Sequence, residues 1–265
     1  MIDSLLARIF VNQWLVLVMA TALLLGFAEL GYRLGHIARR KNAEAAEGHS
    51  GAVQGAVLGL LGLLLGFSFA MAVGRYDSRR TLVVEEANSI GTTWLRADFL
   101  PSPHKEEVRD LLVRYTKLRI EKFAHAESRE AMAPVRKEVA EIHHALWQQA
   151  NDAAKAQPTP ITASFITTLN ETIDLDSCRM AALRNHVPGA VWLLLLIVAG
   201  CGSWASGYGS GTGGFRSSFS QLVFPILIGV VITLIVDIDR PQKGMIGVSQ
   251  QPMQDLLESI QTNKP

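Results

Sequence analysis

The sequence has only 2 cysteines in 265 residues, which excludes a small domain held together by disulfides. Its formal net charge is +1, so it lacks the excess of positive charge that binds nucleic acid. Ser, His, Asp and Cys nowhere follow a spacing typical of nucleophilic catalysis, and no glycine-rich loop is followed by the lysine of a phosphate site. We therefore expect no enzymatic activity, no cofactor and no nucleic-acid partner.

Charge is also missing from four long stretches of the chain. They contain 20, 24, 29 and 20 residues: Ile9–Ala28, Gly51–Gly74, Val187–Phe215 and Ser217–Val236. A helix needs roughly 20 apolar residues to cross the ~30 Å hydrocarbon core of a membrane. The expected fold is an all-α integral membrane protein with four transmembrane helices, at about 9–31, 51–74, 188–206 and 218–237.

The region between the second and third apolar stretches is polar. Residues 75–186 carry 16 basic and 16 acidic side chains, and their apolar residues recur at helical spacing. We expect a soluble helical bundle here, inserted between the membrane segments 1–74 and 187–237. The second of these segments is followed by a polar tail, 238–265. The second membrane helix has no breaker at its end, so Tyr76–Phe99 is predicted to continue it.

Several helix boundaries have sequence signals. Thr159-Pro160 is typical of a helix start, because threonine caps the first turn and proline fits the first helical position. His104–Ala126 and Pro252–Ile260 are predicted to be amphipathic helices. The glycine-rich segment Gly207–Gly214 is predicted to be a flexible turn between the third and fourth membrane helices.

The second apolar stretch has two distinct faces. Small residues at helical spacing lie on one face, and they favour close packing between helices in lipid: Gly51, Gly55, Gly59, Gly62, Gly66, Ala70 and Gly74. Large apolar residues lie on another: Leu60, Leu64, Phe67 and Met71. This second face is expected either to contact lipid or to line a pore that closes by dewetting.

Acidic residues end the fourth apolar stretch, where the helix dipole disfavours negative charge. Asp237 and Asp239 therefore need a compensating charge, which either a metal ion or an arginine cluster would provide. The candidates for an interfacial ion cluster are Arg75, Arg79, Arg80 and Arg240. An acid within the first stretch, Glu29, is expected to reach water or Arg33.

Three segments together resemble the bacterial bestrophin-like domain family of integral membrane proteins. They are LLGLLLGFSFAMAVGRYDSRRTLVVEEANSIGTTWLRADFLP (Leu60–Pro101), NETIDLDSCRMAALRNHVPGAVW (Asn170–Trp192) and DIDRPQKGMIGVSQQP (Asp237–Pro252). More distantly, the chain resembles bestrophins, which are pentameric ion channels with four membrane helices per subunit and cytoplasmic termini. Their second helix lines a hydrophobic neck and continues into a helical cytosolic region.

This resemblance implies a homo-oligomeric ion channel in the bacterial inner membrane, with termini and bundle in the cytoplasm. Leu64, Phe67 and Met71 would face the neck. Calcium gating is not implied, because Ile238 and Arg240 interrupt the run of acids that holds calcium in animal bestrophins. The alternative is a non-conducting scaffold or sensor whose bundle binds a protein partner of unknown identity. The expected partners are therefore the lipid bilayer, further copies of the chain and ions.

Overall fold

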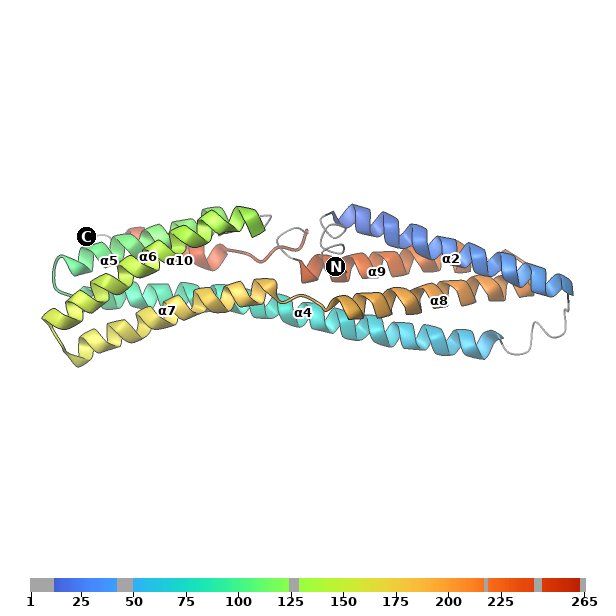
Figure 1. Ribbon diagram of the computed structural model, residues 1–265, viewed down its shortest axis with the longest axis horizontal. Helices are drawn as coiled ribbons and strands as arrows, with labels where there is room; N and C mark the ends of the chain where they lie inside the picture. The colour runs from blue at the N-terminus through green and yellow to red at the C-terminus, as the bar shows by residue number, and fades with distance from the viewer. Residues whose placement is uncertain (1–11, 42–49, 124–128, 217–218, 241–244, 263–265) are drawn as a thin grey trace. The chain divides into compact units, whose positions relative to one another are not determined.

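The computed structural model describes residues 12–41, 50–123, 129–216, 219–240 and 245–262, which are almost entirely helical (Figure 1). The chain divides into two compact units. The apolar unit contains Met1–Gly74 and His186–Ile246, and the polar unit contains Arg75–Asn185 and Gly247–Pro265. In chain order the elements are α2 (Gln13–Lys41), α4 (Ser50–Arg96), η1 (Ala97–Phe99), α5 (His104–Leu118), η2 (Arg119–Phe123), α6 (Arg129–Ala156), α7 (Pro160–Arg184), α8 (Gly189–Gly213), η3 (Phe219–Val223), α9 (Phe224–Asp239) and α10 (Gln251–Thr262).

Four helical segments are long and apolar enough to cross a membrane. Their apolar stretches lie in α2, α4, α8 and α9, and the part of the first stretch before residue 12 lies outside the described residues. Within the described residues no strand is formed. The prediction of an all-α protein with four such helices is confirmed.

The continuous second helix is also confirmed. α4 runs for 47 residues from Ser50 to Arg96 without a break, so a single helix passes from the apolar stretch into the charged sequence. It contains no proline, the residue that most often kinks or ends a helix. After Arg96 the chain tightens into the 3₁₀ turn η1 and then reaches Pro101.

The predicted turn at Gly207–Gly214 is wrong. Helix α8 continues through this segment to Gly213, and only Gly214 adopts a left-handed conformation, with φ of 78°. The glycines serve close packing against α2, which lies alongside α8 (Figure 1). A Cβ atom at Gly207 would lie 2.0 Å from the carbonyl oxygen of Ala28, and one at Gly31 would lie 2.1 Å from that of Trp204.

The polar unit has one apolar core, to which all its long helices contribute. Val108, Leu112, Tyr115 and Leu118 form the buried face of α5, as the helical spacing predicts. The N-cap prediction at Thr159 is confirmed, because its hydroxyl accepts a hydrogen bond of 3.2 Å from the backbone N–H of Thr162. The core also includes Ile90 and Trp94 of α4, Ile142 and Leu146 of α6, Phe165 and Leu169 of α7, and Met253 and Ile260 of α10.

The contact between α2 and α8 predicts the effect of one methyl group. Gly207→Ala places that group 2.0 Å from the Ala28 carbonyl oxygen, which is much closer than van der Waals contact, so the helices must separate. Overpacking of this kind costs about 1–3 kcal/mol. Thermal unfolding in detergent should show a lower midpoint for this variant. Gly26→Ala is the control, since no atom lies within 4 Å of its added Cβ, and equal midpoints for the two variants would contradict the close contact.

Candidate functional site

Helix α4 buries only one of its sides within the apolar unit. Leu61 is 1% exposed, Leu65 is 8% exposed and Ala72 is fully buried. The side chains of Leu58 and Leu61 approach Gly202 of α8. These contacts fix the side of α4 that faces its own chain, and the residues that the structure describes leave the other sides uncovered.

The large apolar residues lie on the uncovered part. Phe67 is 60% exposed and Met71 is 38% exposed, and Leu64 is half-buried. Leu60, one helical turn before Leu64, is 48% exposed. Large apolar side chains left open along one line need either lipid or another protein surface beside them, and the structure is compatible with both.

The small residues form a separate uncovered side. A Cβ atom built on Gly55, Gly59, Gly62 or Gly66 meets no atom within 4 Å, and Ala70 is exposed. The described part of the chain therefore does not pack against this face. The role of these residues in helix packing stays a prediction, and it requires a helix from another molecule.

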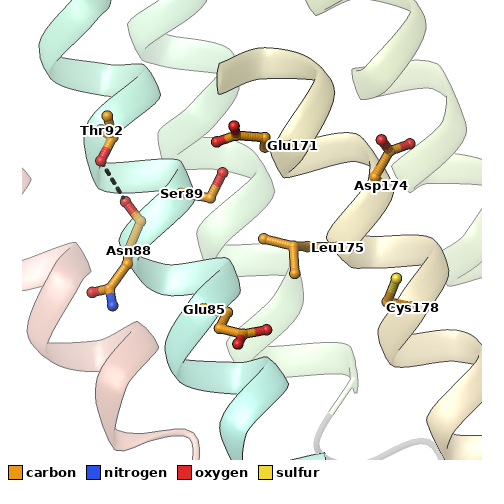
Figure 2. Close-up of a pocket in the computed structure, with 8 residues that line it drawn as sticks. All are labelled: Glu85, Asn88, Ser89, Thr92, Glu171, Asp174, Leu175 and Cys178. Carbon is orange, nitrogen blue, oxygen red and sulfur yellow. Dashed lines mark hydrogen bonds between the residues drawn. The ribbon is translucent and has the colours of Figure 1, made fainter. Parts of the chain in front are cut away.

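The polar unit has an acidic groove between α4 and α7. Figure 2 shows Glu85, Asn88 and Thr92 of α4 opposite Glu171 and Asp174 of α7. The groove has a volume of about 490 Å³, and its lining includes three carboxylates and no basic side chain. Among the described residues no group of three or more His, Cys, Asp and Glu side chains is arranged to hold a metal ion. With three carboxylates and no basic side chain in its lining, the groove is an acidic surface of the polar unit.

On its inner side, α4 contributes Glu86 to a buried ion network. Both Glu86 and Arg119 are fully buried, and Arg119 Nη2 donates to Glu86 Oε2 over 2.9 Å. Arg179 of α7 also donates to Glu86 Oε2 and, through Nη2, to Gln250 Oε1 over 3.1 Å. Asp176 Oδ1 accepts from Arg119 Nη1 over 2.6 Å. Two guanidinium groups thus face two carboxylates, and the network connects α4, η2, α7 and the segment before α10.

A phenol completes this network. Tyr115 of α5 donates its hydroxyl proton to Glu86 Oε1 over 2.5 Å. Burial, and then the negative charge of Glu86, raise the pKa of Tyr115 well above its usual value of 10.0. The phenol therefore keeps the proton that it donates. Every oxygen of Glu86 is bonded, as a buried carboxylate requires.

Sequence reasoning missed this network, although a signal for it is present. Val108, Leu112 and Tyr115 mark the apolar face of α5, and Arg119 follows at the next position of that face. A charged residue on a buried face usually pairs with another charge. Glu86 likewise lies among the buried residues Val83 and Ile90 of α4.

Asp237 and Asp239 are compensated in a way that sequence reasoning also missed. Both are buried at the end of α9. The carboxylate of Asp237 accepts from the backbone N–H groups of Met245 and Ile246 over 2.9 and 3.1 Å. Both carboxylate oxygens of Asp239 accept from the backbone N–H of Val187 over 3.1 Å, and His186 Nδ1 lies 3.6 Å from Asp239 Oδ2. Backbone amides thus offset these charges.

The arginines that were predicted to neutralise Asp237 and Asp239 do not all lie in the same unit as these aspartates. Arg79 of the polar unit donates to the carbonyl oxygens of Ala182 and Asn185, at the end of α7, over 3.1 and 2.8 Å. Arg75 and Arg80 belong to the same unit, whereas Asp237, Asp239 and Arg240 belong to the apolar unit. An ion cluster between the two groups, and a metal at the two aspartates, stay predictions.

The ion pair expected for Glu29 is present. Arg33 Nε lies 2.8 Å from Glu29 Oε1, one turn away on α2. Arg216, which follows α8, also reaches Glu29 Oε2 at 2.6 Å. The acid is thus paired with two arginines at one end of the apolar unit.

The family model of the Bestrophin-like domain matches residues 16–253, which is most of the chain. The chain belongs to the Bestrophin-like family. Together with the four apolar helices, this membership makes it an integral membrane protein. No curated protein matches the sequence.

The bestrophin-like chain is also similar to solved structures. One is a variant of a bacterial bestrophin homologue from Klebsiella pneumoniae, with 14% identity, 92% of this chain and 99% of that chain covered, and a TM-score of 0.68. Another crystal structure of a homologue from this organism has 14% identity, 91% and 98% coverage, and a TM-score of 0.66. At this identity the comparison shows a shared fold.

The buried network predicts a large effect of a small change. Glu86→Gln keeps the shape of the side chain but removes the charge that Arg119 and Arg179 share, and breaking a buried ion pair costs about 3–5 kcal/mol. The thermal midpoint of the full chain should fall clearly. The exposed neighbour provides the control, because Glu85→Gln should change stability by about 0.5 kcal/mol or less. Equal midpoints would show that Glu86 does not stabilise the polar unit.

Proposed function

We propose that this bestrophin-like protein is a homo-oligomeric ion channel in which several copies of α4 surround a pore. Leu64, Phe67 and Met71 form its hydrophobic neck. Water leaves an apolar constriction of this kind readily, so the neck is a barrier to ions until it is widened or wetted. The resemblance to bestrophins supports this function, and no enzymatic activity is proposed.

The observation that carries the proposal is the division of α4 into three sides. One side, with Leu61 and Leu65, is buried within the chain, while the small residues and the large apolar residues lie on two separate uncovered sides. A helix that lines a pore in a ring needs this division: one side for its own subunit, one for the neighbouring subunit and one for the pore. We assign the small side to the neighbour, with contacts through Gly55, Gly59, Gly62, Gly66 and Ala70.

The side that carries Phe67 also changes character along the helix. Phe67 and Glu85 are eighteen residues apart, about five turns at 3.6 residues per turn, so both lie on the same side of α4. Ser78 and Thr92 lie close to this line, and both are exposed. One side of the helix is thus apolar before Gly74 and polar after it, as a narrow neck that opens into a water-filled vestibule requires.

The Phe67→Asn variant distinguishes between a Phe67 side chain that lines a pore and one that faces lipid. In a dewetted neck the amide meets water and lowers the barrier to hydration, so the variant should assemble normally and conduct more than the wild type. Phe67→Ala should also raise conductance, by widening the ring. On a lipid face the amide would lie unpaired in hydrocarbon, and expression and assembly would fall. Planar bilayers with chloride, sodium and potassium salts provide the measurement.

The control for this experiment is Leu61→Asn. Leu61 is 1% exposed, so an amide there should reduce the yield of folded protein whether or not α4 lines a pore. If Phe67→Asn and Phe67→Ala both assemble normally and carry no current in any of the salts, the protein is not a channel. The alternative function, a non-conducting scaffold or sensor whose bundle binds a protein partner, would then be the proposal.

We further propose that the protein lies in the bacterial inner membrane, with its termini and polar unit in the cytoplasm. Phe215 follows α8 and is 66% exposed, and Trp147 of α6 is 43% exposed. In a protein without Cys178 and Cys201, the Phe215→Cys variant should react with an impermeant thiol reagent in intact cells. The Trp147→Cys variant should react only after lysis, and the reverse pattern would invert the orientation.

A further inference from the structure

A second pocket in the polar unit lies between α6 and α7. Its volume is about 340 Å³, which is within the range of ~300–1,000 Å³ typical of small-molecule sites. The α7 residues in its wall are spaced so that they lie on the other side of that helix from the acidic groove. The residues that define it, here named the basic pocket, are Arg136, Val139, Ala140, His143, Asp176, Ser177, Met180, Ala181 and Arg184.

Two arginines from different helices converge on the basic pocket. Arg136 belongs to α6 and Arg184 to the last turn of α7, and both are exposed. Neither guanidinium group has a hydrogen-bond or ion-pair partner among the residues that the structure describes. Asp176 does not neutralise them, because its carboxylate is already bonded to the buried Arg119 over 2.6 Å. The pocket therefore has an excess of positive charge.

The interior of the pocket offers neutral polar and apolar groups. Burial lowers the pKa of His143, which the charge of Asp176 opposes, so the imidazole stays neutral at pH 7 and offers one N–H donor. Its Nε2 atom is buried, with no hydrogen-bond partner among the described residues. Ser177 adds an exposed hydroxyl, and Val139 and Met180 provide an apolar wall.

We propose that the basic pocket binds a small organic anion, a phosphate or carboxylate compound, through Arg136 and Arg184. Guanidinium groups bind both oxyanions by charge-assisted hydrogen bonds, often in a bidentate manner. The apolar wall then contacts the carbon skeleton of the ligand. This proposal goes beyond channel function and does not depend on conduction.

The position of the basic pocket connects its ligand to helix α4. Asp176 lines the pocket and bonds Arg119, which in turn bonds Glu86 of α4. His143 lies against Tyr115, with ring centroids 5.1 Å apart, and Tyr115 donates to the same carboxylate. An anion bound in the pocket would thus lie beside Asp176, a member of the network that includes Glu86 of the proposed pore helix.

Isothermal titration calorimetry of the full chain in detergent tests the proposal, with inorganic phosphate and malonate as probes at constant ionic strength. At least one probe should bind the wild type, and the one that binds identifies the anion class. Arg136→Ala and Arg184→Ala should each weaken that binding about tenfold or more, because each removes a charge-assisted hydrogen bond.

Arg80→Ala is the matched control. It removes the same charge from an exposed position on α4 outside the pocket, so it should leave binding within about twofold of the wild type. Three outcomes would overturn the proposal: neither probe binds, binding survives unchanged in both pocket variants, or Arg80→Ala weakens binding as much as they do.

Discussion

An α-helix returns to the same side every 3.6 residues, so the 47 residues of α4 present the same few sides along its whole length. The residues on each side must match the apolar unit before Gly74 and the polar unit after it. The buried side meets this constraint with leucine and alanine in the apolar unit and with valine, isoleucine and Glu86 in the polar unit. The uncovered side that carries Phe67 meets it by changing from large apolar residues to Ser78, Glu85 and Thr92.

Glu86 fixes the rotation of α4 within the polar unit. A buried carboxylate that accepts from Tyr115, Arg119 and Arg179 cannot turn away from them without leaving charges unpaired in the interior. Because Glu85 is the adjacent residue, this arrangement directs it outward into the acidic groove. The same contacts that stabilise the polar unit therefore determine which residues of α4 face solvent within that unit.

Features that depend on local sequence were predictable. The absence of charge over 20 or more residues indicated the membrane helices, and Thr159-Pro160 indicated the start of α7, because each signal lies within a single continuous segment of the chain. A turn was wrongly predicted at Gly207–Gly214 because glycine disfavours an isolated helix. In α8 the close approach of α2 compensates for that cost. The partners of Asp239 and Glu86 were not predictable, since Val187 and Arg179 come from distant parts of the chain.

The central claim is that copies of the chain cover the small side of α4, and native mass spectrometry of the intact protein tests it most directly. The wild type should be a closed ring of several identical subunits, because a pore on a symmetry axis requires them. Gly62→Leu should reduce this ring to monomers, and Gly26→Leu, a leucine in equally open space on α2, should leave the subunit number unchanged. A monomeric wild type, or a Gly62→Leu variant with the wild-type subunit number, would contradict the account.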